Sequence, residues 1–235
     1  MRRCCPVDAV IPVLYEDNHL LAVVKPAGVP VQEDSSGDAD LLTLLKAYIK
    51  EKYRKPGAVY LGLIHRLDRP VGGVMVFART SKAAARLSAA IREGRTEKEY
   101  LCVCLGEPAG GVYEDWLLKD GKTFSSRSVP PDTPGGKPAR LTLAPLQTRE
   151  GLTLCRVTLA TGRSHQIRVQ CASRGTPLWG DQRYNPSVRP GQDIALFCVR
   201  MTVPHPVKKE AITFTASPQG KIWDLFDLPP SGSFS

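Results

Sequence analysis

Two short segments concentrate the side chains that could do chemistry, and the first of them is His65-Arg66-Leu67-Asp68-Arg69-Pro70. The apolar pair Leu63-Ile64 leads into it, and Gly72 and Gly73 follow it. This pattern is typical of a chain that leaves a core strand and turns sharply, so that its side chains face a cleft. The Asp68 carboxylate could act there as a nucleophile or a base. A surface ion pair of Asp68 with Arg66 or Arg69 is the alternative.

The second segment, Thr161–Val169, combines a glycine turn with a dense polar cluster. Thr161-Gly162-Arg163 is predicted to be a tight turn, and a helix is predicted over 164–173. Gln166 and Arg168 would then lie on this helix. They could line a site or form a solvated helix face, and the residue types alone leave both interpretations open.

Local patterns predict the elements that must position these segments. Alternation and turn residues indicate a hairpin over 11–24 and strands over 74–78, 100–105, 140–147, 152–160, 194–203 and 211–216. Apolar spacing predicts helices over 39–53, capped by Asp38 or Asp40, and from Thr80 or Ser81 to Arg92. The stretch 106–140 is predicted to be strand fragments and loop, with a mobile connection over 128–137, and a helical turn is expected within 220–228. Few helices among many strands predict an α+β fold with a mixed, mainly antiparallel sheet.

The composition is that of a globular protein with a basic balance. The 235 residues include 32 Lys and Arg against 23 Asp and Glu, which gives a net charge of +9. Nucleic acid or an anionic membrane surface suits this sign, although a solvated basic face would produce it as well. Within 155–205 the only acidic residues are Asp181 and Asp193. The sequence has no apolar run long enough to span a membrane, and residues 1–6 do not resemble a signal peptide.

The seven cysteines are predicted to be buried free thiols in a reducing compartment. Cys102 and Cys104 are expected on one face of a strand. They lack a second pair at ligand spacing, so no metal site is predicted.

Several motifs, in order along the chain, resemble those of the RluA-type pseudouridine synthase family. The residues that carry the resemblance are Tyr15–Gly28, His65-Arg66-Leu67-Asp68, Glu97–Leu101, Gly162–Val169, Pro177–Tyr184 and His205-Pro206. The likeness extends over about residues 10–228. Val71-Gly72-Gly73 and Ser164 differ from the family's usual Thr-Ser-Gly and Thr, and the charged positions are intact.

The resemblance implies a role for each matching residue. Asp68 would be the catalytic aspartate, Arg168 the cation that pairs with it, and Tyr100 the aromatic residue that stacks on the target base. The target uridine would be flipped out of folded RNA, with Arg66 filling the vacated stack. The candidates for phosphate contacts are Arg69, Lys82, Arg86, Arg92 and Arg163. His65 and His165 are expected to be structural hydrogen-bonding groups.

The resemblance also implies the setting of the reaction. The chemistry would isomerise uridine in ribosomal or transfer RNA, without a metal or any other cofactor and without a membrane. The expected protein is a cytoplasmic monomer with an extension over 1–9, one catalytic domain over 10–228 and a flexible tail over 229–235. Since about ten residues precede the first hairpin, we expect no S4 domain of the kind that many relatives carry.

Three other functions are considered. A catalytically silent RNA-binding protein of the same fold is disfavoured by the presence of Asp68, Tyr100 and Arg168. A glycosidase would need a second carboxylate beside Asp68, and the motifs offer no clear one. A DNA-binding regulator is disfavoured because the sequence has no helix-turn-helix or zinc-finger pattern.

Overall fold

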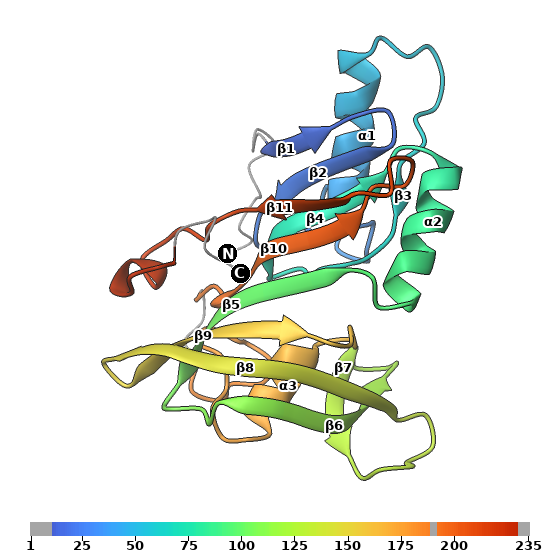
Figure 1. Ribbon diagram of the computed structural model, residues 1–235. Helices are drawn as coiled ribbons and strands as arrows, with labels where there is room; N and C mark the ends of the chain where they lie inside the picture. The colour runs from blue at the N-terminus through green and yellow to red at the C-terminus, as the bar shows by residue number, and fades with distance from the viewer. Residues whose placement is uncertain (1–10, 189–191, 230–235) are drawn as a thin grey trace. The chain divides into compact units, whose positions relative to one another are not determined.

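Antiparallel strand pairing dominates the computed structural model, which describes residues 11–188 and 192–229 (Figure 1). The predicted α+β class is therefore confirmed. The chain forms two compact units: residues up to Thr96 join Arg200–Ala216 in the first, and Glu97–Val199 join the residues from Ser217 onward in the second. The single catalytic domain over 10–228 stays a prediction. The predicted extension, and the predicted tail beyond Pro229, fall outside the described residues.

Two central strands form the buried middle of the first unit's sheet. β2 (Leu20–Lys25) pairs with β1 (Val13–Glu16) on one side and with β4 (Gly72–Ala78) on the other. β3 (Gly62–Leu63) also pairs with β4, and β11 (Ala211–Thr215) pairs with β10 (Leu196–Pro204) over Arg200–Pro204. All seven residues of β4 are buried, as the apolar run 74–78 predicts.

Both helices of this unit begin at the side-chain caps that the sequence predicts. The Asp40 carboxylate accepts from the Thr43 N–H at the start of α1 (Leu41–Lys52). The Thr80 hydroxyl accepts from the Ala83 N–H at the start of α2 (Ser81–Arg92). These caps satisfy N–H groups that have no partner within the helix, which fixes where each helix starts.

The turn of the first hairpin is held by a buried histidine from far along the chain. Asp17 accepts from the N–H groups of His19 and Leu20, both at 2.7 Å. His205 lies 2.8 Å from Asp17 through Nε2, while its Nδ1 accepts from the Val207 and Lys208 N–H groups. Nε2 must therefore carry the proton and donate it to Asp17. Burial alone would raise the pKa of Asp17, but these hydrogen bonds outweigh it and lower the pKa to about 2.

Replacing Asp17 by Asn should destabilise the fold in a pH-dependent way. The folded-state pKa of Asp17, about 2, lies below the ordinary value of 3.8. The stabilisation that the ionised Asp17 carboxylate gives the folded state is therefore fully present above about pH 4, where it amounts to about 2 kcal/mol. It is lost as the pH falls through 2. Urea unfolding at pH 7 and at pH 3 measures it, with exposed Glu33→Gln as the control. An equal loss at both pH values would contradict the assignment.

The second unit is an antiparallel sheet with an α-helix packed against it. Its strand order is β5 (Glu97–Leu105), β9 (Leu152–Leu159), β8 (Lys137–Arg149), β6 (Gly111–Asp120) and β7 (Ser125–Val129). The strand fragments predicted within 106–140 are β6, β7 and the start of β8, and β6 is a full strand of ten residues. The adjacent charged residues Glu114 and Asp115 of β6 break the expected alternation, because Asp115 faces α3 (Gln166–Ala172) and has its bonding partners there.

The helix α3 packs on this face of β6 and β8. Its Val169 lies in one apolar cluster with Leu117 of β6 and Ala139 of β8. The helix predicted over 164–173 is therefore confirmed. The helical turn expected within 220–228 is a 3-10 helix at Trp223–Leu225, in the cluster that covers β5 and β9.

The cysteines within the described residues are free and buried. Cys102 and Cys155 are cross-strand partners in β5 and β9. Cys104 and Cys171 lie near Cys102, and these neighbouring thiols, together with burial, raise the pKa of the Cys102 thiol. The predicted buried thiols are confirmed for these residues, whereas Cys4 and Cys5 lie outside the described part of the chain.

Candidate functional site

The Asp68 segment turns sharply between β3 and β4, as the sequence predicts. Its side chains alternate: His65 and Leu67 are buried, Arg66 is exposed and Asp68 is half-buried. The His65 Nε2 accepts from the Val76 N–H of β4 at 3.1 Å, which confirms a structural role for this histidine. The Val71 N–H bonds to the Asp68 carbonyl and closes the turn. The segment thus anchors two side chains in the core and presents Arg66 and Asp68 at the surface.

A fully buried lysine fixes the backbone just beyond Asp68. Lys25, at the end of β2, is 0% exposed, and its ammonium donates to the carbonyls of Pro26, Arg69 and Val71 at 2.9, 3.0 and 2.8 Å. Three carbonyls match the three N–H groups of an ammonium and compensate for its removal from water. Lys25 therefore ties the turn after Asp68 to the end of β2.

Replacing Lys25 by Met should keep the apolar stem but leave three buried or partly buried carbonyls without their donor. Each lost charged hydrogen bond to a buried group is worth about 1–3 kcal/mol, so we expect a loss of at least about 3 kcal/mol in the free energy of unfolding. Urea unfolding measures it. Lys46→Met on α1 is the control. A Lys25 variant as stable as the wild type would show that the carbonyls do not depend on this ammonium.

Arg69 holds a neighbouring loop instead of standing free for a phosphate. Its Nε donates to the Gly28 carbonyl at 3.0 Å, and its Nη1 lies 2.9 Å from the Ser36 hydroxyl and 3.3 Å from Asp34. Its Nη2 bonds to Asp38. The residue predicted to bind RNA therefore has two carboxylate partners of its own, and a phosphate would have to compete with them. Asp38, one of the two predicted caps of the first helix, bonds to Arg69, and Asp40 is the cap.

In the second unit, the functional candidate Arg168 forms a buried ion pair with Asp181. The Nε and Nη2 of Arg168 donate to the two carboxylate oxygens of Asp181 at 2.8 and 2.7 Å. The side chains are 5% and 0% exposed. Burial would raise the pKa of Asp181, but hydrogen bonding and attraction from Arg168 outweigh it and lower that pKa. The fork fixes the guanidinium plane and leaves Nη1 outside this pair.

Buried polar side chains brace the turn and helix that carry Arg168. Gln166 accepts from the Arg163 N–H at 2.9 Å and donates to the Arg140 carbonyl at 3.1 Å. His165 shares a 2.7 Å hydrogen bond with the hydroxyl of Tyr184, whose ring lies 5.2 Å from the Arg168 guanidinium. The solvated helix face offered as an alternative is therefore wrong, because Gln166 and Arg168 are both buried. His165 has the structural role expected of it.

The other predicted residues are distributed over both units. Tyr100 lies on β5 opposite Val157 and is 6% exposed. Lys82, Arg86 and Arg92 are exposed on α2, and the Arg86 guanidinium donates to the Pro206 carbonyl at 2.6 Å. Arg163 donates through Nε to the Pro138 carbonyl at 2.9 Å. Asp68 belongs to the first unit and Arg168 to the second, and their pairing stays a prediction.

Lys25 and Asp181 are functional candidates that the sequence reasoning missed. Each carried a signal: Lys25 ends the apolar run Leu20–Val24, and Asp181 is one of two acidic residues in the basic stretch 155–205. Both lie inside motifs that carry the family resemblance. Within residues 11–188 and 192–229, no group of three or more His, Cys, Asp or Glu side chains is arranged to hold a metal ion. No helix in that part of the chain is long and apolar enough to cross a membrane.

Comparison with known proteins gives consistent relatives. The family model described as RNA pseudouridylate synthase matches residues 19–173. The chain is 34% identical over 190 residues to ribosomal large subunit pseudouridine synthase D of Yersinia pestis. The aligned residues cover 80% of this chain and 57% of that protein. It is 32% identical over 174 residues to ribosomal large subunit pseudouridine synthase C of Vibrio vulnificus, covering 73% and 52%. The chain thus spans about half the length of these two relatives.

A third relative is covered more fully, and solved structures share the fold. The uncharacterized RNA pseudouridine synthase YhcT of Bacillus subtilis is 31% identical over 216 residues, which cover 90% of this chain and 70% of that protein. The human RNA pseudouridylate synthase domain containing 4 superposes with a TM-score of 0.73 at 19% identity, over 88% of each chain. The human RNA pseudouridylate synthase domain containing 1 superposes with a TM-score of 0.71 at 22% identity, over 89% of this chain and 84% of that chain.

Proposed function

Because this chain belongs to the RluA-type RNA pseudouridine synthase family, we propose that it isomerises specific uridines in ribosomal RNA to pseudouridine. The observation that carries the proposal is the family match over 19–173, which contains Asp68, Tyr100 and Arg168 together. The names of two relatives support ribosomal RNA of the large subunit as the substrate. Action on transfer RNA is the alternative. The monomeric state and the cytoplasmic location stay predictions.

The proposed reaction breaks the C1′–N1 bond of uridine and joins C1′ to C5 of the same base. The C5 hydrogen leaves as a proton, and N1 gains one, so that the reaction needs no oxidant or reductant. Asp68 is the proposed nucleophile or base, since a half-buried carboxylate can reach a substrate while its backbone is held. We assign to Arg168 the role of pairing with Asp68, as the family resemblance implies, while Asp181 fixes the plane of the guanidinium.

The target base must leave the RNA stack to reach these groups. Exposed Arg66, two residues before Asp68, is the proposed side chain that fills the gap, and Tyr100 is the proposed stacking partner of the base. Lys82, Arg86, Arg92 and Arg163 are the proposed phosphate contacts. To Arg69 we assign the holding of the 28–38 loop, because its guanidinium is bonded within that loop.

The experiment that tests this function uses RNA from cells in which the gene is deleted. Incubation with the purified protein should release tritium from uridine labelled at C5 and restore pseudouridine at the positions lost in the deletion strain. Restored sites in large-subunit ribosomal RNA support the proposal, and sites in transfer RNA support the alternative. Specific RNA binding without tritium release would favour a catalytically silent RNA-binding protein.

A further inference from the structure

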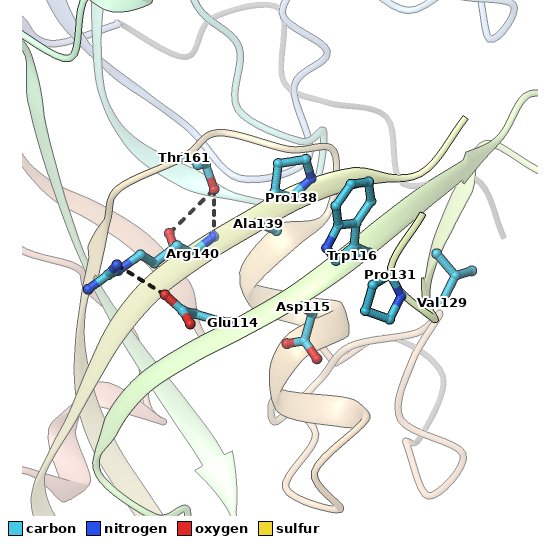
Figure 2. A pocket seen from close by; sticks show the side chains of 9 residues that line it. All are labelled: Glu114, Asp115, Trp116, Val129, Pro131, Pro138, Ala139, Arg140 and Thr161. Carbon is cyan, nitrogen blue, oxygen red and sulfur yellow. Dashed lines mark hydrogen bonds and ion pairs between the residues drawn. The ribbon is translucent and has the colours of Figure 1, made fainter. Parts of the chain in front are cut away.

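A pocket on the second unit's sheet has no role in the proposed chemistry. Its volume is about 490 Å³, and it opens on the face of β6 and β8 that lies away from α3 (Figure 2). Trp116 of β6 lines it, with Pro138 directly across on β8 and Val129 directly across on β7. Figure 2 shows Pro131 and Pro138 on either side of the partly buried Trp116. The pocket therefore has an aromatic and proline floor.

The acidic residues of this pocket are neutralised within the protein. Glu114 lies 3.0 Å from Arg140, its cross-strand neighbour. Asp115 points to the other side of the sheet, where its carboxylate bonds to Arg174 at 2.8 Å and to the Gln170 amide at 2.6 Å. Their charges are thus paired with side chains of the protein.

Two arginines lie outside the lining of the pocket, on the turn and the strand that border it. Arg163 donates to the Pro138 carbonyl through Nε, which holds its guanidinium beside the floor while Nη1 and Nη2 take no part in that bond. Arg127 of β7 is exposed, and strand alternation puts it on the same face as Val129. The pocket thus combines an apolar floor with positive charge at its edge, on a chain whose net charge is +9.

We propose that this pocket binds an unpaired nucleobase of the RNA strand that flanks the target uridine. The base stacks on the Trp116 indole between the two prolines, and Arg163 and Arg127 contact its phosphates. The proposal rests on the proposed function, because Thr161 and Arg163 belong to the turn that leads directly into the helix bearing Arg168. A base held here keeps the strand in place while its neighbour is flipped out.

An RNA base fits these observations better than a peptide does. An indole face accepts any base, because every base offers a flat π surface, and the positive edge suits a phosphate chain. The prolines have no N–H to donate, so that their rings present only apolar surface to a stacked ring.

The test compares Trp116→Ala and Trp116→Phe with the wild type. Loss of one stacked base weakens RNA binding by about tenfold, so the Ala variant should raise KM about tenfold and leave kcat nearly unchanged. The Phe variant, which keeps an aromatic face, should restore most of the affinity. Val112→Ala is the matched control, since Val112 is 50% exposed on the same face of β6 but outside the pocket. Thermal unfolding verifies that each variant is folded.

A second measurement separates this inference from the proposed function. Binding of a short single-stranded oligouridylate carrying 4-thiouridine is followed by photocrosslinking and mass spectrometry, and crosslinks are expected on the peptide that contains Trp116. An active enzyme whose Ala variant binds RNA like the wild type overturns the inference and leaves the function intact. Weakened oligouridylate binding in the Ala variant of a protein that forms no pseudouridine supports the pocket and refutes the function. Crosslinks confined to other peptides overturn the inference.

Discussion

Asp68→Asn should abolish pseudouridine formation while leaving RNA affinity within a few-fold of the wild type. The amide keeps the size of the side chain but cannot act as a nucleophile or a base, and loss of such a group lowers turnover by at least about 10³-fold. Folding should be unaffected, because His65, Leu67 and the Lys25 contacts anchor the turn without the Asp68 carboxylate. Tritium release from labelled RNA measures turnover, and filter binding measures affinity.

The matched control for Asp68→Asn is Asp224→Asn, the same chemical change at an exposed position of the second unit. It should behave like the wild type in both assays. A variant protein prepared from a deletion strain excludes contaminating endogenous enzyme. Appreciable product from purified Asp68→Asn would refute the role proposed for this aspartate, whereas loss of RNA binding in this variant would indicate a structural role instead.

Arg168→Ala should cause a large loss of stability. It leaves the Asp181 carboxylate, which is 0% exposed, without its bidentate partner. Breaking a buried pair in this way costs about 3–5 kcal/mol, because an uncompensated charge remains buried. Arg168→Lys keeps the charge but loses the fork, so that it should be destabilised less and keep more activity than the Ala variant. Urea unfolding and tritium release measure the two effects.

Two further measurements assign that loss to the ion pair. The double variant Arg168→Ala with Asp181→Asn should be more stable than Arg168→Ala alone, because the buried charge is gone. Arg168 lowers the pKa of Asp181, so that the deficit of the Ala variant should shrink as acid protonates the carboxylate. An Arg168→Ala protein as stable as the wild type would show that the Arg168–Asp181 pair does not stabilise the fold. A stability loss that does not change with pH would show the same.

Local sequence determined the elements for which a local physical cause exists. Asp40 and Thr80 mark helix starts because a side-chain oxygen must reach an N–H three residues on, which is visible in the sequence itself. The apolar run of β4 likewise predicts a strand buried on both faces. β6 was predicted only as strand fragments, because the adjacent charges Glu114 and Asp115 break the alternation and Asp115 finds its partners on α3 only in the folded protein.

The chemistry-bearing residues were found in the sequence, but their partners were decided by the tertiary structure. The motifs located Asp68 and Arg168, because dense ionisable residues beside glycine turns are visible along the chain. That Arg168 pairs with Asp181, and that Lys25 holds the turn after Asp68, depends on contacts between segments distant in sequence. A buried charge takes whichever opposite charge or carbonyl the fold brings within about 3 Å, and only the three-dimensional packing decides which residue that is.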